Sequence, residues 1–192
     1  AYKDESWRFS LKSFKALGGA YAVANLLIAK LNEKGIKANS SDLIEGSYRE
    51  LTETITVCCA TDGNHGRSVA WGAQNFGCNC EIYIHRHVSK GREQAIAKFG
   101  AKVNRIEGNY DDSVHLAAKV AEERGYYVVS DTSYEGYTQI PKDVMQGYTV
   151  MVSETIDQIE ENPTHVFLQG GVGGFPAAVV SYLAESLESA PI

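Results

Sequence analysis

The sequence predicts an α/β protein built on a parallel β-sheet, and three observations lead to this prediction. Short runs rich in β-branched and aromatic residues alternate with amphipathic stretches that end at glycine. Each amphipathic stretch has the length of a helix that crosses over a sheet, and such connections make the strands parallel. The chain has 192 residues, 44% hydrophobic and 22% charged, which is the composition of an ordinary globular protein.

The alternation occupies the middle of the chain. Four strands are expected there, at about residues 54–60, 80–84, 102–106 and 126–130. Three helices are expected to connect them, at about residues 65–76, 89–99 and 110–124, and each is followed by a glycine. Together these elements predict a small α/β domain over residues 52–139.

The two flanks of the small domain are expected to form one larger α/β domain, from residues 1–51 and 140–192. Long helices are expected at about residues 13–33 and 141–160. Residues 39–50 are largely polar and show no periodicity, so we expect a connector there. The chain then continues with a strand at 165–168, a glycine loop at 170–174 and a closing helix at about 176–187.

Charge and hydropathy exclude two classes of partner. Lys and Arg number 18 against 24 Asp and Glu, so the formal charge is −6 and no basic field exists to bind nucleic acid or anionic lipid. The most apolar stretch, residues 18–29, contains Asn25 and is shorter than the roughly 20 residues that cross a bilayer. We therefore expect neither a nucleic-acid partner nor a membrane partner.

The four cysteines do not suggest a disulfide or zinc framework. Cys58 and Cys59 are adjacent, and Cys78 and Cys80 are two residues apart, spacings that match neither pattern. We expect reduced, mostly buried thiols in a cytoplasmic protein, with no metal site. The chain starts without an initiator Met or a secretory leader, which favours a piece of a longer protein.

The first candidate binding motif is the loop from Gln169 to Pro176. Because it follows an apolar strand and begins a helix, its amides are suited to a phosphate group. Pro176 occupies the third glycine position of the dinucleotide fingerprint, and no Walker lysine follows, so a single terminal phosphate is the expected ligand. The alternative is a tight strand-to-helix turn without a ligand.

The second candidate motif, residues 60–67, lies at the end of the first predicted strand, where open α/β sheets bind ligands. Asn64 offers a side-chain amide and Asp62 a carboxylate; the alternative for both is an ordinary helix cap and turn. For His65 we prefer a structural role, held by its neighbours.

The third candidate is Lys15, at the start of the first long helix. Its apolar and small neighbours could desolvate the amine, which lowers a lysine pKa and favours Schiff-base formation. Taken alone, such a lysine is far more often a solvated surface charge, so this hypothesis depends on the other two motifs.

The order of the three motifs resembles that of the tryptophan-synthase-β family, the fold type II enzymes that use pyridoxal 5'-phosphate. Within that family the details resemble the ammonia-lyases that act on 2,3-diaminopropionate. The segments that carry this closer resemblance are residues 3–6, 14–19, 60–67, 134–137 with Ile140 and Pro141, and 145–148.

The resemblance implies a role for each motif. Lys15 would hold the cofactor covalently, Asn64 would contact the hydroxyl of its ring, and the loop would bind its phosphate. Asp62 replaces the small hydroxyl residue of most relatives, and Asp131, after the fourth strand, would also face the substrate. The loop residues concerned are Gly170, Gly171, Val172, Gly173 and Gly174.

The implied reaction is α,β-elimination of D- or L-2,3-diaminopropionate, an amino acid, to pyruvate and ammonia. Lys15 and Asp62 would remove the Cα proton from opposite faces, and Asp62, if enclosed, could also shuttle a proton to the leaving amine. A serine or threonine dehydratase, a non-catalytic module that binds a phosphorylated metabolite, and an inactive fragment remain alternatives.

The resemblance also implies a homodimer of chains about twice this length. In such chains the C-terminal half contacts the ring nitrogen of the cofactor and completes the sheet of the larger domain. We therefore expect apolar surface on the present chain.

Overall fold

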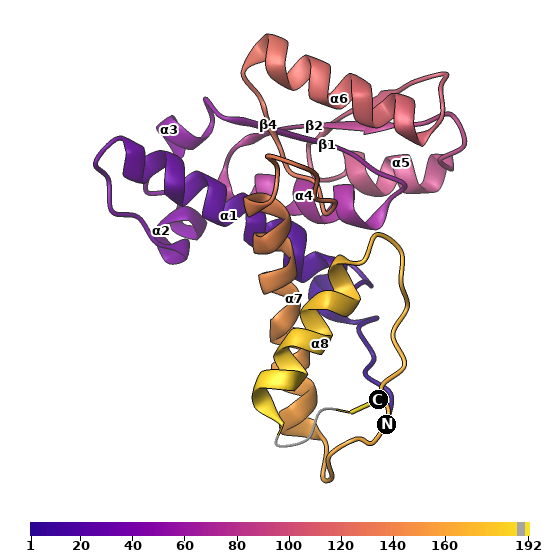
Figure 1. The fold of residues 1–192 in the computed structure, drawn as a ribbon. Helices are drawn as coiled ribbons and strands as arrows, with labels where there is room; N and C mark the ends of the chain where they lie inside the picture. The colour runs from indigo at the N-terminus through magenta and orange to yellow at the C-terminus, as the bar shows by residue number, and fades with distance from the viewer. Residues whose placement is uncertain (188–190) are drawn as a thin grey trace.

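The computed structural model describes residues 1–187 and 191–192, and a four-stranded parallel sheet lies in its upper part as seen in Figure 1. The strands are β1 (Thr56–Ala60), β2 (Asn79–Ile84), β3 (Lys102–Arg105) and β4 (Tyr127–Val128), in the order β3-β2-β1-β4. All three pairings are parallel, with Val57 opposite both Cys80 and Tyr127. The predicted α/β class with a parallel sheet is confirmed.

Helices cover both faces of this sheet. In Figure 1, α4 (Asn64–Phe76) and α5 (Lys90–Ala97) lie on one face and α6 (Tyr110–Arg124) on the other. Because both faces are covered, β1 is buried along its centre rather than alternately buried and exposed. The four cysteines are free; burial raises the pKa of the Cys58 thiol to about 12, which keeps it protonated.

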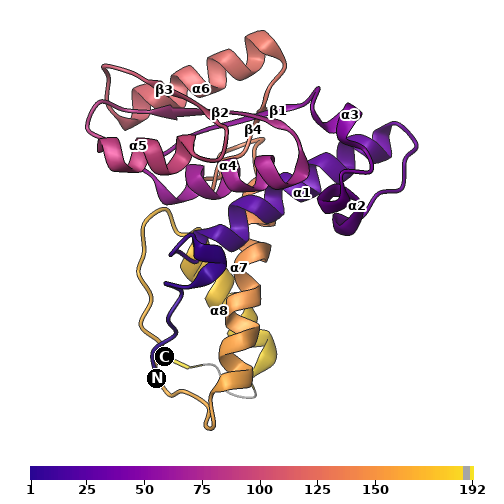
Figure 2. The same ribbon diagram turned by 180° about the vertical axis from the view of Figure 1, so that it is seen from behind.

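Three further helices pack one against the next, and the first of them packs on a helix that covers the sheet. The first, α1 (Lys15–Glu33), packs on α4 and on α7 (Gln139–Gln158), and α7 packs on α8 (Gly174–Ser186). Figures 1 and 2 show α7 and α8 on the side of α1 away from the sheet, with the two chain termini close together. None of the helices within residues 1–187 combines the length and apolar composition that a bilayer crossing requires.

The segment at residues 39–50 connects α1 to β1 as expected, but it is not irregular, because it contains the short helix α2 (Ser40–Glu45) and the start of α3 (Arg49–Thr52). The Asn39 side chain accepts hydrogen bonds from the amides of Ser41 and Asp42, and the Asp42 carboxylate accepts one from the Asn39 amide. This reciprocal cap, together with the buried Leu43, stabilises a helix in a polar sequence.

The strand expected at residues 165–168 is absent. Among the described residues its backbone pairs only with the chain end: the Val166 amide donates to the Ile192 carbonyl, and the Ile192 amide to the Thr164 carbonyl, both at 2.9 Å. Two hydrogen bonds do not make a ladder, and the Phe167 side chain is 94% exposed.

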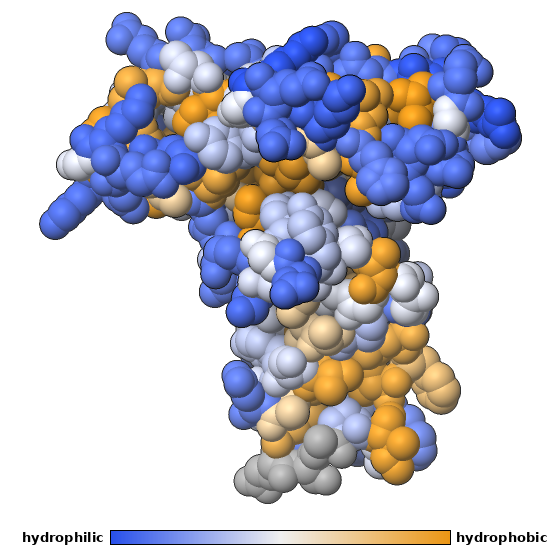
Figure 3. Space-filling view, turned by 45° about the horizontal axis from the view of Figure 1, so that its top comes forward, coloured by the Kyte–Doolittle hydropathy of each residue, from blue (hydrophilic) through white to orange (hydrophobic). Residues whose placement is uncertain are grey.

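Exposed apolar residues gather on the part of the molecule built by α7 and α8, whereas hydrophilic residues dominate the surface around the sheet (Figure 3). Val150 of α7 and Val180 of α8 belong to this exposed apolar set. The expectation of exposed apolar surface is met in this region.

Helix α1 approaches its neighbours more closely than ordinary side chains permit. A Cβ atom on Gly147 of α7 would lie 2.7 Å from the Leu17 carbonyl oxygen, and one on Gly18 would lie 2.6 Å from the Val144 carbonyl oxygen. On the other side, the buried Ser68 hydroxyl donates to the Ala16 carbonyl at 3.0 Å. These contacts fix the start of α1 against both α4 and α7.

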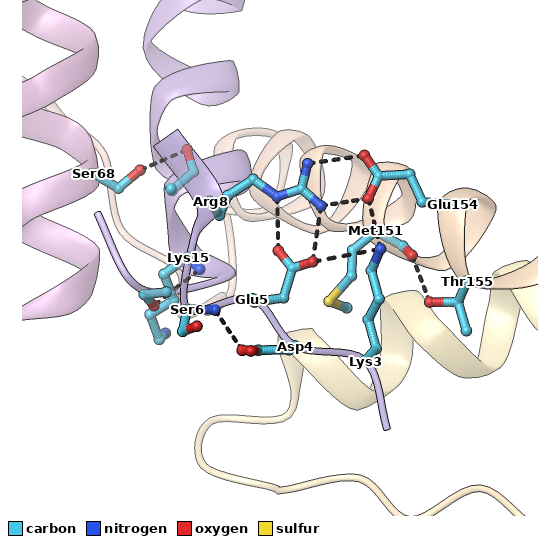
Figure 4. A network of polar contacts seen from close by, with 12 residues as sticks. Lys3, Asp4, Glu5, Ser6, Arg8, Lys15, Ser68, Met151, Glu154 and Thr155 are labelled. Atoms are coloured by element: carbon cyan, nitrogen blue, oxygen red, sulfur yellow. Dashed lines mark hydrogen bonds and ion pairs between the residues drawn. The ribbon is translucent and has the colours of Figure 1, made fainter. Parts of the chain in front are cut away.

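A network of charges ties the N-terminal segment to α7 (Figure 4). The Arg8 guanidinium binds the carboxylates of both Glu5 and Glu154, and the Lys3 amine lies 2.9 Å from Glu154. Hydrogen bonds from Arg8 and then from Lys3 lower the pKa of Glu154 to about 2. The network therefore anchors to α7 the N-terminal segment that leads into α1.

Replacing Gly147 with alanine should lower the free energy of unfolding by about 1–3 kcal/mol, because the new methyl group would press on the backbone of α1. Urea denaturation measures this loss. Gly91→Ala in α5 is the matched control, since nothing lies within 4 Å of the position its Cβ would take and alanine favours a helix. Equal stability of both variants would contradict the close packing of α1 on α7.

Replacing Glu154 with glutamine should remove a pH-dependent contribution to stability. The folded pKa lies below the ordinary value of 4.5, so the contribution is full above about pH 5 and is lost as the pH falls toward about 2. The carboxylate is partly exposed, which limits the effect to about 1 kcal/mol, or about 2–4 °C in thermal midpoint at pH 7. Glu160→Gln, at an exposed position six residues later in the chain, is the control. If the thermal midpoints of the parent and Glu154→Gln differed as much at pH 2 as at pH 7, the network would be contradicted.

Candidate active site

A cavity of about 380 Å³ lies where the C-terminal ends of the strands meet the starts of several helices. Lys15 and Asn64 are the first residues of α1 and α4, and Asp62 and Asp131 follow β1 and β4. The structure therefore brings together residues from widely separated parts of the sequence. The cavity is lined by Lys15, Ala60, Thr61, Asp62, Gly63, Asn64, His65, Arg92, Tyr110, Asp131, Gly171 and Val172.

The Lys15 amine forms an ion pair with the Asp131 carboxylate across 116 positions of sequence. The lysine side chain is partly buried, and it lines both this cavity and a second one beside it. Lys15 is thus neither on the open surface nor enclosed in the core, and it lies in the wall of both cavities.

Asp131 is the more buried partner, with 13% of its side chain exposed. Burial opposes ionisation of this carboxyl, but the nearby His65 ring and the Lys15 amine outweigh it, so the pKa of Asp131 lies below its usual value. The backbone before it is fixed by Tyr137, whose hydroxyl donates to the Val128 carbonyl and accepts from the Ser130 amide, both at 2.9 Å. Asp131 is therefore an ionised carboxylate in a rigid position.

His65 is buried beside this pair. Its Nε2 lies 2.7 Å from the Val129 carbonyl oxygen, which requires the proton to be on Nε2. Burial lowers the pKa of His65, and Nδ1, 3.8 Å from Asp131, has no hydrogen-bond partner among the described residues. This geometry supports the structural role expected for His65.

The turn between β1 and α4 is capped by Thr61, not by the residues first considered for that role. The Thr61 hydroxyl accepts hydrogen bonds from the amides of Gly63 and Gly66, at 3.0 and 3.1 Å. The Asn64 side chain, which lines the cavity, accepts a hydrogen bond from Arg67 at 3.2 Å. The Asp62 and Asn64 side chains are consequently not needed for capping.

Asp62 is at the mouth of the cavity, with 65% of its side chain exposed. The enclosure considered in the sequence analysis is therefore absent among the described residues. Instead, Oδ1 of Asp62 lies 2.7 Å from Nε2 of His85. This contact joins the residues that follow two neighbouring strands.

The glycine loop borders a second cavity, of about 210 Å³. Gly173, with φ of +89°, turns the chain into α8, and a Cβ on Gly174 would lie 3.5 Å from the Asp131 carbonyl oxygen. Nothing lies within 4 Å of the position that a Cβ would take on Gly170 or Gly171, so packing within the chain does not require glycine there. Four of the five expected loop residues, Gly171, Val172, Gly173 and Gly174, line this cavity; Gly170 lines neither cavity.

The sequence analysis missed several residues that line the two cavities. Arg92 and Tyr110 belong to the crossover helices α5 and α6, and burial raises the pKa of Tyr110 to about 12. Tyr148 of α7 is buried in the wall of the second cavity, and its hydroxyl has no hydrogen-bond partner among the described residues. The one available signal was position: Tyr110 begins a helix at the same edge of the sheet as Asn64.

These residues fit pyridoxal 5'-phosphate. An amine for its aldehyde lies between two cavities, an amide side chain lines the first, and a glycine loop at a helix N-terminus borders the second. The glycines that packing does not require leave room for a group to approach the backbone. Within residues 1–187 and 191–192, no cluster of three or more metal-ligating side chains occurs.

Several known proteins are similar to this chain in sequence and in fold. A diaminopropionate ammonia-lyase of Escherichia coli is 44% identical over 186 residues, 95% of this chain and 46% of that protein. A diaminopropionate ammonia-lyase of Salmonella typhimurium is 40% identical over 193 residues, 97% of this chain and 47% of that protein. The crystal structure of diaminopropionate ammonia lyase from Escherichia coli in complex with D-serine matches with a TM-score of 0.87 and 42% identity, over 95% of this chain and 47% of that one.

The chain thus spans about half the length of the curated relatives it matches. Residues 1–192 match the family described as "Pyridoxal-phosphate dependent enzyme". With the lysine, the asparagine turn and the glycine loop around two cavities that share lining residues, these matches show that the chain belongs to the family of pyridoxal-phosphate dependent enzymes.

Proposed function

We propose that this chain carries the active-site residues of a lyase that eliminates ammonia from 2,3-diaminopropionate. The β-amine leaves as ammonia, and addition of water then releases the α-amine as a second ammonia and gives pyruvate. The observation that carries the proposal is the presence of Lys15, Asp62 and Asp131 around one cavity. The 44% identity to an ammonia-lyase of this specificity supports it.

Pyridoxal 5'-phosphate, when bound, supplies an electron sink that stabilises negative charge at Cα of the substrate. Lys15 would hold it covalently through its amine, Asn64 would hydrogen-bond its hydroxyl, and the amides of the glycine loop would bind its phosphate. The positive end of the α8 dipole favours that phosphate.

Lys15 and Asp131 act together in this proposal. Although burial opposes ionisation of Asp131, the nearby His65 ring and the Lys15 amine lower its pKa, so its carboxylate would attract the ammonium group of an incoming amino acid. When the substrate takes its place, the released amine can remove the Cα proton as a general base. Asp131, already within hydrogen-bond reach, would keep that amine in the site.

Asp62 supplies the feature that an ammonia-lyase needs and a dehydratase does not. An amine leaves readily only when protonated, and a carboxylate at the cavity mouth attracts the β-ammonium group of the substrate. If Asp62 lies on the face of the substrate opposite to Lys15, it can also remove the Cα proton of the other enantiomer. Two bases on two faces would let one site accept both D- and L-substrates.

The alternatives are a serine or threonine dehydratase on the same scaffold and a module that binds a phosphorylated metabolite without catalysis. The acidic Asp62 and the identity to ammonia-lyases favour the proposed reaction over a dehydratase. Comparing pyruvate release from 2,3-diaminopropionate with release from serine separates these two. A module without catalysis would release pyruvate from neither.

Three further features belong to this proposal. We assign residues 52–139 to a small domain and residues 1–51 and 140–192 to a larger one, with the site between them. The protein would act as a homodimer on a small amino acid, with no nucleic-acid or membrane partner. Four free cysteines support a reducing compartment, for which we propose the cytoplasm.

Addition of pyridoxal 5'-phosphate followed by borohydride should fix a pyridoxyl group on Lys15, because no other lysine of the described residues lines either cavity. Peptide mass spectrometry locates the label, and Lys15→Ala should abolish both the label and the visible absorbance. Lys12→Ala, an exposed lysine three residues earlier, should keep both. A label on another lysine would overturn the proposed site.

Replacing Asp62 with asparagine should lower turnover of one enantiomer of 2,3-diaminopropionate by about 10²- to 10⁴-fold, the usual contribution of a general base, and spare the other within about threefold. Pyruvate release from each enantiomer measures the effect. Asp157→Asn, an exposed aspartate of α7, should leave both unchanged. Equal losses on both enantiomers would refute the two-base hypothesis while leaving Asp62 a role in binding.

A further inference from the structure

We propose that His85 is a positioning residue for Asp62, holding one oxygen of its carboxylate so that the other is presented to the substrate. This inference rests on the proposed function, in which Asp62 serves the elimination. It assigns a role to a histidine that directly follows β2.

The sheet brings His85 and Asp62 together. Asp62 comes two residues after β1 and His85 directly after β2, and these neighbouring parallel strands are in register, with Ala60 opposite Tyr83. The Thr61 amide extends the ladder by donating to the Tyr83 carbonyl at 3.1 Å. The 2.7 Å contact between the two side chains therefore joins two rigid backbone positions.

The surroundings of the ring decide which nitrogen carries its proton. The His87 amide donates to Nδ1 of His85 at 3.3 Å, and a nitrogen that accepts a hydrogen bond carries no hydrogen. In the neutral ring the proton must then be on Nε2, which faces Oδ1 of Asp62. His85 therefore donates a hydrogen bond to the carboxylate, which is the correct polarity for holding an ionised aspartate.

Burial shows which partner holds the other. Only 16% of the His85 side chain is exposed, against 65% for Asp62. The His85 ring packs edge-on against Tyr110, and Arg105 donates to the His85 carbonyl at 3.3 Å. Oδ2 of Asp62 makes no hydrogen bond to the described residues, so a fixed imidazole holds one oxygen and leaves the other available.

A competing partner makes this restraint useful. Arg92 lines the same cavity, and its Nη1 lies 3.4 Å from the Asp62 carbonyl oxygen. Without His85, the carboxylate would be free to turn toward this guanidinium, which would neutralise it and withdraw it from the substrate. We therefore expect His85 to matter for the orientation of Asp62 more than for folding.

The test compares His85→Ala and His85→Gln in the protein loaded with pyridoxal 5'-phosphate. The alanine variant should lower turnover of the enantiomer that depends on Asp62 by about tenfold to a hundredfold, and spare the other enantiomer. The glutamine variant should recover to within about threefold of the parent, because its side-chain amide also donates from the Nε2 position. His87→Ala removes the neighbouring ring but keeps the amide that binds His85, and should change neither enantiomer.

A spectroscopic readout is independent of turnover. Nitrogen-15 NMR of labelled histidines should find the proton of His85 on Nε2, and Asp62→Asn should shift this nitrogen more than any other histidine nitrogen. A proton on Nδ1, or no response to Asp62→Asn, would overturn the proposal. So would an equal loss of both enantiomers in His85→Ala, which would indicate a general structural role.

The outcome for Asp62→Asn separates this inference from the proposed function. If Asp62→Asn is selective for one enantiomer and His85→Ala is not, the role of His85 is wrong and the function stands. If Asp62→Asn is not selective, the two-base function is wrong. The double variant then decides on His85: a loss no greater than that of Asp62→Asn alone supports positioning, and additive losses overturn it.

Discussion

The position of the Lys15 amine depends on how closely α1 approaches its two neighbouring helices. Gly18 and Gly147 bring the backbones of α1 and α7 into direct contact, and Ser68 of α4 binds the first turn of α1. Because α4 is itself packed on the sheet, this chain of contacts relates Lys15 to the strand ends. The ion pair with Asp131 is the result: it joins the first turn of α1 to the residue after Val129 and Ser130.

Much of the sheet could be predicted because its elements are marked locally. The helix at 110–124 was predicted to the residue, since an asparagine cap begins it and Gly125 ends it. The strand at 165–168 could not be judged in the same way. Apolar residues signal a strand, but pairing depends on a neighbour from elsewhere in the chain, and the described residues offer only Ile192.

The residues of the candidate site also differ in whether the local sequence marks them. Asp62 and Asn64 were found because they follow a strand and begin a helix at the edge of a parallel sheet where ligands bind. Asp131 follows another strand at the same edge, and its role, like that of Lys15, was implied by the family resemblance. His85 satisfies the same rule, since it follows β2, yet a histidine between Ile84 and Arg86 carries no local sign of a partner. Its contact with Asp62 depends on strand order, which sequence periodicity does not contain.

The two carboxylates of the site lie in different environments, and this difference supports different roles. Asp131 is partly buried and ion-paired, and its pKa is lowered, so it remains charged and attracts cationic groups. Asp62 is exposed, and Nε2 of His85 holds its Oδ1 while Oδ2 makes no hydrogen bond to the described residues, so this carboxylate is open to the substrate. A site that must bind a cationic substrate and also move a proton needs one carboxylate of each kind, because the pairing that keeps Asp131 ionised also makes it a weak base.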